Sequence, residues 1–259
     1  MDYRLIMIKQ IPNMFTLLNL FFGCLAIIAT VQTGLTISTD NSLVIIPEKI
    51  VMASVFIAIA AMVDFFDGFV ARLLKVPSEL GKQLDSLADV VSFGVAPGMI
   101  IYQFLRLSFS QQANGLDVNT LWLMPAFLLP CAGAYRLARF NIDTEQSYGF
   151  KGVPIPAAGL LIAAFPLIFW HPSQADWIIN LLLNKWFWYV VIIIISYLMV
   201  STLPMLALKF KNATVKSFLP FIIMAVVAIV SALFFNWMAV PITFAAYVII
   251  SLVFKSPKT

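Results

Sequence analysis

The chain has 259 residues, of which hydrophobic side chains make up 62% and charged side chains only 11%. Soluble globular proteins average about 25% charged residues and roughly half apolar ones. The composition therefore excludes a soluble domain, a disordered chain and a secreted disulfide scaffold, and it predicts an all-α, polytopic membrane protein. The formal net charge of +4 comes from scattered basic residues without a dense patch, so nucleic acid is not an expected partner.

A stretch of about 20 mostly apolar residues is long enough to cross a bilayer as a helix. By this measure the sequence predicts a bundle of about eight transmembrane helices, at residues 13–32, 50–73, 80–107, 120–139, 153–170, 186–206, 217–235 and 238–254. Only Asn236 and Trp237 separate the last two, which predicts a tight antiparallel hairpin. We expect three units: an interfacial N-terminal segment over 1–12, a membrane domain of six spans over 13–206, and two additional spans over 207–259.

With these spans, the Lys and Arg residues divide unequally between the two sides of the membrane. Thirteen of the sixteen fall on the side that holds both termini, and only Lys49, Arg106 and Lys185 fall on the other. Loops rich in Lys and Arg stay on the cytoplasmic side of a membrane. We therefore expect an integral protein of a prokaryotic-type cytoplasmic membrane, with both termini in the cytoplasm.

Four aspartates lie inside the predicted second and third spans, where charged side chains are rare. Asp64 and Asp67 are three residues apart near the end of one span, and Asp85 and Asp89 are four apart near the start of the next. Each spacing places both carboxylates on one helix face, and the short connection predicts antiparallel helices with the two pairs facing each other. Buried carboxylates need compensating cations, and the membrane-embedded parts of these helices contain no Lys or Arg. Hard oxygen ligands favour Mg²⁺, Mn²⁺ or Ca²⁺ over zinc, so we expect two divalent ions, an arrangement suited to phosphoryl transfer.

Spacing alone leaves two further roles open for these aspartates. The carboxylates could satisfy polar groups between helices, or they could mark a cation or proton pathway through a transporter. The small residues Gly68, Ala71 and Gly81 flank the two pairs and would let a bulky ligand approach the backbone.

Eight residues in and beside these spans match the motif of the CDP-alcohol phosphotransferase family at every fixed position and spacing. They are Asp64, Asp67, Gly68, Ala71, Arg72, Gly81, Asp85 and Asp89. Three further segments, DSLADVVSFGVAPG (85–98), YRLARFN (135–141) and KGVPIPAAG (151–159), resemble the membrane-spanning phosphatidylserine synthase branch of that family, as does IPNMFTLLNL near the start. The resemblance runs from about residue 11 to 159, and beyond that only the hydropathy is similar.

The resemblance implies the CDP-alcohol phosphotransferase fold, a homodimer and transfer of the phosphatidyl group of CDP-diacylglycerol to the hydroxyl of L-serine, with release of CMP. It implies that Asp64, Asp67 and Asp85 bind metal, and that Asp89 touches the second ion and acts as the general base. The residues expected at CDP-diacylglycerol are Asn13, Thr16, Asn19, Gly68, Ala71, Arg72 and Gly81. For the three residues of the first span, helix capping and interhelical hydrogen bonding are the alternatives.

Serine carries a carboxylate that a planar cation can bind through two hydrogen bonds. We expect Arg139 in this role, with Arg136 and Lys151 as supporting cations and Ser92 as a weaker contact. Each of the three cations could instead be a positive-inside anchor of the membrane protein. A sister enzyme that uses glycerol 3-phosphate, inositol or choline as acceptor is the alternative to a serine-specific one.

Overall fold

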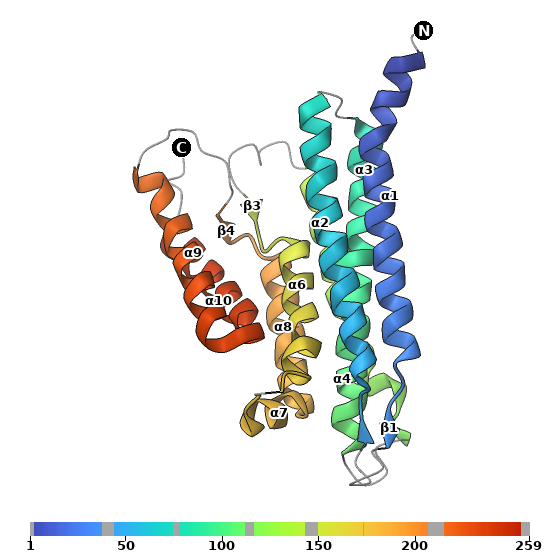
Figure 1. The fold of residues 1–259 in the computed structure, drawn as a ribbon, viewed down its shortest axis with the longest axis vertical. Coiled ribbons are helices and arrows are strands. Elements are labelled where there is room, and N and C mark those ends of the chain that lie inside the picture. The colour runs from blue at the N-terminus through green and yellow to red at the C-terminus, as the bar shows by residue number, and fades with distance from the viewer. Residues whose placement is uncertain are drawn as a thin grey trace.

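The computed structural model describes residues 3–37, 44–74, 78–111, 117–142, 150–172, 174–206 and 215–254. Within these ranges the protein is a bundle of helices that lie side by side (Figure 1). The helices are α1 (Tyr3–Gln32), α2 (Val51–Leu74), α3 (Glu79–Asp89), α4 (Ala96–Ser110), α5 (Leu128–Ile142), α6 (Ile155–Phe169), α7 (Asp176–Leu182), α8 (Lys185–Val200), α9 (Val215–Phe235) and α10 (Ala239–Val253). The predicted all-α membrane architecture is confirmed.

Short elements connect the helices. Four two-residue strands form two antiparallel pairs: β1 (Thr36–Ile37) with β2 (Val44–Ile45), and β3 (Phe150–Lys151) with β4 (Pro204–Met205). Turns of 3₁₀ helix are η1 (Glu48–Ile50), η4 (Thr120–Trp122), η5 (Met124–Phe127) and η6 (Asn236–Met238), and η2 (Val90–Val95) is a π-helical segment between α3 and α4.

Four helical stretches of the described chain are long and apolar enough to cross a membrane: Gln10–Gln32, Glu48–Leu74, Glu79–Ser110 and Phe218–Val253. A fifth results if α7 and α8, which meet at 70°, form one broken span. The last stretch contains both α9 and α10, and these pack against each other as the predicted hairpin, with Asn236 at a φ of 49° in the turn. The total of eight spans stays a prediction.

Three of the expected boundaries that differ from the structure have a proline nearby. Helix α1 continues through Pro12 instead of starting after it, although proline removes one backbone hydrogen bond. The expected fourth span opens with η4 and η5 before α5 begins at Leu128, and Pro125 lies at the start of η5. Helix α8 ends at Val200, before the expected residue 206, and Pro204 lies in the strand that follows. The interfacial position of residues 1–12 stays a prediction; residues 1 and 2 lie outside the described chain.

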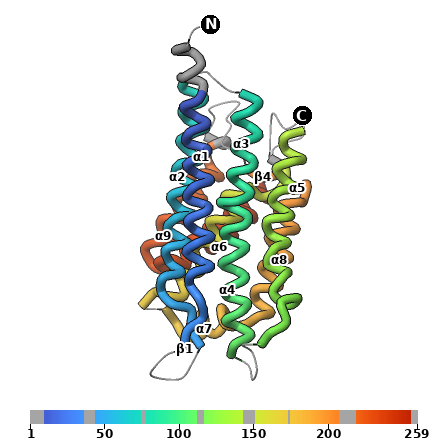
Figure 2. The backbone as a smooth tube through the Cα atoms, turned by 90° about the vertical axis from the view of Figure 1, so that its right-hand side faces the viewer, coloured from blue at the N-terminus to red at the C-terminus, as the bar shows by residue number. Residues whose placement is uncertain are grey.

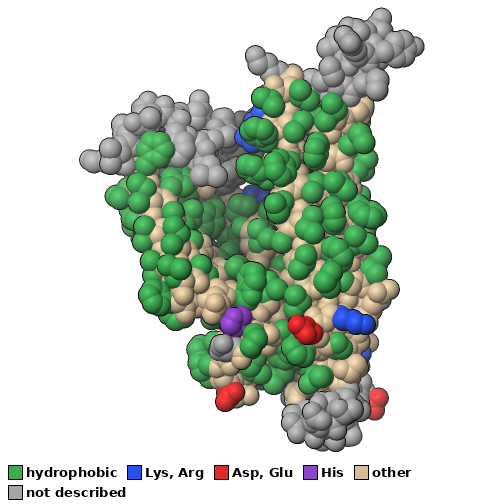
Figure 3. Space-filling model, in the orientation of Figure 1, with side chains coloured by type: hydrophobic (Ala, Val, Ile, Leu, Met, Phe, Trp, Pro, Cys, Tyr) green, Lys and Arg blue, Asp and Glu red, His purple; other side chains and the backbone are tan. Residues whose placement is uncertain are grey.

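The beginning of α1 and the end of α10 lie at the same end of the molecule, so the two described ends of the bundle agree with termini on one side of a membrane (Figure 1). Helix α3, the segment η2 and helix α4 form one continuous helical stretch over Glu79–Ser110, called the α3–α4 rod below. In the view turned by 90°, this rod stands between α1 and α5 (Figure 2). The visible side chains over the helices are mostly hydrophobic, and the visible Asp and Glu side chains lie near the lower end (Figure 3). This distribution is that of an integral membrane protein.

Helices α1 and α6 each pack closely against the π-helical segment η2, which directly follows Asp89. A Cβ atom on Gly23 of α1 would lie 2.3 Å from Ser92 Oγ, and one on Gly159 of α6 would lie 2.9 Å from the Cα of Phe93. Real Cβ atoms do not come this close to other atoms, so both glycines are required by close helix approach. The packing fixes the height of α1 relative to α3, and with it the position of the polar side chains described next.

Candidate metal centre

Three of the aspartates meet between α2 and α3. One carboxylate oxygen from each of Asp64, Asp67 and Asp85 lies within 4.8 Å of the other two. Asp67 is buried, and the other two are half-buried. Clustered carboxylate oxygens are the ligands that hard divalent cations prefer, so the residues present fit the metal ion that the motif implies.

The helices that carry these aspartates are held by α1. Helix α1 packs along α2 and against α3, and α2 and α3 approach each other less closely than either approaches α1. The expected direct packing of the two acidic helices is therefore replaced by packing of both on α1, and it is the side chains that bring the carboxylates together. Residues 75–77 of their connection lie outside the described chain.

Asp89 lies one helical turn beyond Asp85 and is 6% exposed. It is outside the group of three oxygens but lies close to Asp64, because Asn19 Nδ2 is 3.4 Å from Asp64 Oδ1 and 3.4 Å from Asp89 Oδ1. The structure thus brings all four predicted aspartates together, three as a compact oxygen cluster and the fourth, Asp89, beside it.

Helix α1 supplies hydrogen-bond donors to these acids. Thr16 Oγ1 donates to Asp67 Oδ2 at 2.8 Å, one turn before Asn19. For Thr16 and Asn19 the interhelical hydrogen bonds considered from the sequence are therefore present. Asn13, a further turn earlier, donates from Nδ2 to Gln10 Oε1 at 2.9 Å. Contact of these three residues with a nucleotide stays a prediction.

The small motif residues differ in what surrounds them. A Cβ atom on Gly68 would meet nothing closer than Arg72 Nη2 at 3.9 Å, so no described neighbour requires a glycine there. At Gly81 the same atom would lie 3.0 Å from Ser78 Oγ, which caps α3 by accepting a hydrogen bond from Gly81 N. The space at Gly81 is therefore tight, whereas the space beside Gly68 is open and fits the approach of a ligand. Ala71 is half-buried on the same helix, and Arg72 is exposed and donates from Nε to Gly68 O at 2.8 Å.

Arg136 is a buried cation on α5, a helix that packs against the one that carries Asp85 and Asp89. It is 6% exposed, and its Nε has no hydrogen-bond partner within the described chain. Helix α5, which carries it, packs against η2 and α3. A buried guanidinium without a full set of partners is costly, which makes Arg136 a candidate for binding an anion.

Arg139 has other partners. Its Nη1 donates to Val200 O at 2.8 Å and its Nη2 to Ser201 O at 3.0 Å, at the carboxyl end of α8. Carbonyls at the end of a helix lack partners within the helix, and a cation there is favourable. The two terminal nitrogens that we expected at the serine carboxylate are therefore bonded to the backbone of α8.

The KGVPIPAAG segment also joins the end of α8. Gly152 N donates to Leu203 O at 2.9 Å and Val153 N to Leu198 O at 3.0 Å. Gly152 has a φ of 77°, and a Cβ atom on it would lie 2.4 Å from Met199 O, so only glycine fits. Lys151 is half-buried in β3, next to this junction.

Two further contacts near the site had not been predicted. Lys82 Nζ donates to Asn141 O at 3.0 Å, and Asn141 Nδ2 donates to Ser86 Oγ at 2.8 Å, so the end of α5 is tied to the helix of Asp85. Ser92, expected near serine, is fully buried and donates from Oγ to Asn19 O at 3.0 Å. Its side chain is thus part of the contact between α1 and η2.

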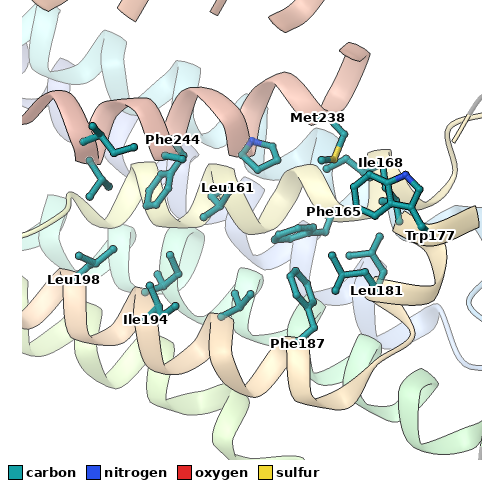
Figure 4. A pocket seen from close by; sticks show the side chains of 18 residues that line it. Leu161, Phe165, Ile168, Trp177, Leu181, Phe187, Ile194, Leu198, Met238 and Phe244 are labelled. Atoms are coloured by element: carbon teal, nitrogen blue, oxygen red, sulfur yellow. The ribbon is translucent and has the colours of Figure 1, made fainter. Parts of the chain in front are cut away.

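A large cavity lies away from the aspartates. It has a volume of about 440 Å³ and is lined by α6, α7, α8, η6 and α10 (Figure 4). Phe165, Phe187 and Met238 are among its walls, and its lining contains no carboxylate, cation or hydroxyl. It offers no group for phosphate or serine, so the polar chemistry of the described chain centres on the aspartates.

Several curated proteins are similar to this chain. A CDP-diacylglycerol–serine O-phosphatidyltransferase of Helicobacter pylori is 36% identical over 159 residues, which cover 61% of this chain and 57% of that protein. A protein of the same name from Bacillus subtilis is 34% identical over 160 residues, with 60% and 73% covered. An archaetidylserine synthase of Methanothermobacter thermautotrophicus is 29% identical over 168 residues, with 64% and 61% covered.

The match to the Helicobacter protein spans little more than half of that protein's length. Residues 9–186, more than half of this chain, match the CDP-alcohol phosphatidyltransferase family, and the match includes α2, α3 and every motif aspartate. This chain therefore belongs to the CDP-alcohol phosphatidyltransferase family.

Proposed function

We propose that the protein transfers the phosphatidyl group of CDP-diacylglycerol to the hydroxyl of L-serine, giving phosphatidylserine and CMP. The observation that carries this proposal is the meeting of Asp64, Asp67 and Asp85 beside Asp89 in membrane-spanning helices of a phosphatidyltransferase. The relatives named serine O-phosphatidyltransferase support serine as the acceptor.

The aspartates have two roles in this proposal. Asp64, Asp67 and Asp85, with a contribution from Asp89, hold two divalent ions, Mg²⁺ or Mn²⁺ with Ca²⁺ as a third candidate. When bound, the ions supply the positive charge that neutralises the pyrophosphate and the leaving CMP. Asp89 accepts the proton of the serine hydroxyl as the hydroxyl oxygen attacks the β-phosphorus of CDP-diacylglycerol. The bond between that phosphorus and CMP breaks, and CMP leaves.

The donor lies on the membrane side of the same site. Gly68 and Ala71 leave room for the nucleotide, Arg72 pairs with a phosphate, and Gly81 borders the site. Asn13, Thr16 and Asn19 line it from α1. The acyl chains stay in the surrounding membrane lipid, and the site faces the cytoplasm of a prokaryotic-type cell. The homodimer implied by the family resemblance belongs to the same proposal.

For the serine carboxylate we propose Arg136 as the main partner, because it is buried on α5 and the terminal nitrogens of Arg139 are already bonded to the backbone of α8; the Nε of each arginine has no hydrogen-bond partner within the described chain. Serine would then place its hydroxyl at Asp89 and its carboxylate at Arg136. Arg139, whose terminal nitrogens bind α8, takes a supporting part, together with Lys151 and the weaker contact Ser92.

We expect Arg136→Lys to raise the apparent KM for serine by about 10- to 150-fold, because a lost charge-assisted hydrogen bond is worth roughly 1.5–3 kcal/mol. The KM for CDP-diacylglycerol should change much less. Arg106→Lys, at the opposite end of the α3–α4 rod, is the matched control and should leave both values near wild type. If Arg139→Lys gave the larger rise in serine KM, the carboxylate would belong to Arg139. If neither variant changed it, both cations would be anchors.

The function itself is tested by CMP release from CDP-diacylglycerol in lipid–detergent micelles with different acceptors. We expect release that requires a divalent ion and serine, with phosphatidylserine as the lipid product. Release that depends on glycerol 3-phosphate, inositol or choline would assign a sister enzyme. No release with any acceptor, together with cation flux in proteoliposomes, would favour a transporter.

A further inference from the structure

The amide of Asn19 is placed among the carboxylates in an unusual way. Its side chain is fully buried, and its Nδ2 faces two acceptors, Asp64 Oδ1 and Asp89 Oδ1, at 3.4 Å each. Both distances are long for an N–H···O hydrogen bond, which is typically about 2.9–3.0 Å. Its Oδ1 is also buried and has no hydrogen-bond partner within the described chain. Neither end of the amide is therefore well satisfied by the protein.

The position of this residue is fixed. The backbone carbonyl of Asn19 accepts a hydrogen bond from Ser92 Oγ at 3.0 Å. One turn later Gly23 lies against the same serine. Because α1 is held against η2 at both places, Asn19 cannot move away from the acids without separating the helices. The unsatisfied amide is thus a built feature of the centre.

The neighbours of the amide decide what can satisfy its oxygen. The hydrogen-bond partners of its side chain are carboxylates, which are acceptors and cannot donate a hydrogen bond to Oδ1 when ionised. A cation bound to those carboxylates could meet the oxygen, because side-chain amide oxygens are ordinary ligands of hard divalent cations. The terminal torsion of Asn has two broad orientations, so exchange of the two amide atoms requires no movement of the backbone.

We infer that Asn19 is a ligand of the divalent ion held by Asp64 and Asp89, through its side-chain Oδ1. Without the ion, the amide nitrogen faces both carboxyl groups, and the amide oxygen has no hydrogen-bond partner within the described chain. With the ion, the carboxylates no longer need that donor, and the oxygen turns to the metal. This role differs from contact with the nucleotide, and it rests on the metal dependence in the proposed function.

Metal binding tests this inference without measuring turnover. Purified protein in lipid–detergent micelles is titrated with Mn²⁺ in the presence of CMP, and free Mn²⁺ is followed by electron paramagnetic resonance. We expect Asn19→Leu, which keeps the size of the side chain but removes both polar atoms, to weaken Mn²⁺ affinity by at least about 10- to 100-fold, the loss typical for groups that support a metal site. Ser54→Ala is the matched control, since it removes another buried, unpartnered polar atom on α2 and should leave the affinity unchanged.

A spectroscopic measurement separates the oxygen of Asn19 from its nitrogen. In protein labelled with ¹³C at the asparagine side-chain amide, electron–nuclear double resonance should show coupling between bound Mn²⁺ and one amide carbon. The coupling should disappear in Asn19→Asp, which retains an oxygen ligand and so should still bind Mn²⁺, but which carries no label there. Because this variant is loaded with metal, the result does not depend on the folding of Asn19→Leu.

The outcomes are distinct. Bound Mn²⁺ without amide coupling in the wild type would overturn the role of Asn19 and leave the proposed function intact. Failure of the wild type to bind Mn²⁺ at all would instead overturn the metal dependence on which both proposals rest. Coupling that persists in Asn19→Asp would assign the ligand to another asparagine and would also overturn the inference.

Discussion

Asp85→Asn should lower serine-dependent CMP release by at least about 10²- to 10³-fold, the loss expected when one group that stabilises transition-state charge is removed. The change keeps the size of the side chain but removes one of three oxygens that lie within 4.8 Å of one another. Asp64→Asn and Asp67→Asn should behave in the same way. The measurement is initial velocity at saturating serine, together with Mn²⁺ affinity in the same preparation.

The cause of that loss can be separated from general damage to the protein. Asp176→Asn, in the first turn of α7, removes a carboxylate outside the cluster and should keep wild-type velocity. Because the cluster variants lose a metal ligand, high Mn²⁺ should partly restore them, and their Mn²⁺ affinity should be lower. A cluster variant with wild-type velocity and wild-type affinity would remove that aspartate from the metal site.

Asp89→Asn should lower turnover by about 10²- to 10⁴-fold, the contribution typical of a general base. The amide that replaces the carboxylate cannot accept the proton of the serine hydroxyl. Because Asp89 lies outside the group of three oxygens, the variant should keep the ion bound by Asp64, Asp67 and Asp85 and its binding of CDP-diacylglycerol, whereas the second ion, which Asp89 shares with Asp64, should bind more weakly. Single-turnover release of CMP from bound donor, started by serine, is the measurement.

The comparison with Asp85→Asn makes this assignment specific. Asp85→Asn should lose metal binding and turnover together, whereas Asp89→Asn should lose turnover out of proportion to metal binding. Added Mn²⁺ should not restore Asp89→Asn. A turnover near the wild-type value in this variant would mean that another group, or water, accepts the proton.

The aspartate cluster could be predicted because its geometry is mostly local. Spacings of three and four residues place each pair on one helix face, and a short connection brings the two faces together. The alternatives for Thr16 and Asn19 could be stated for the same reason, since their spacing follows the helix repeat. What the spacing did not predict is that α1, and not direct packing of α2 on α3, holds the acids in place.

The contacts that the sequence did not predict join residues far apart in the chain. Lys82 reaches Asn141 across 59 residues, and Arg139 reaches Val200 across 61. A helical position tells which face of α5 carries Arg139, but not which element lies opposite that face. The end of α8 at Val200 was likewise missed, because its apolar sequence continues to residue 206 and gives no periodic signal of the strand that begins at Pro204.

The π-helical segment η2 divides one span into two halves with different phases. A π-helical turn closes its hydrogen bond one residue later than an α-helical turn, and each helical residue rotates the side-chain direction by about 100°. The helix face that carries Asp85 and Asp89 on α3 therefore does not line up with the corresponding face of α4. On α4, Phe104 stacks on Trp188 of α8, with 4.7 Å between the ring centroids. Because the phase changes at η2, the face that α4 turns toward α8 is set separately from the face that α3 turns toward α1, so a change in the apolar packing of α4 need not rotate the aspartates.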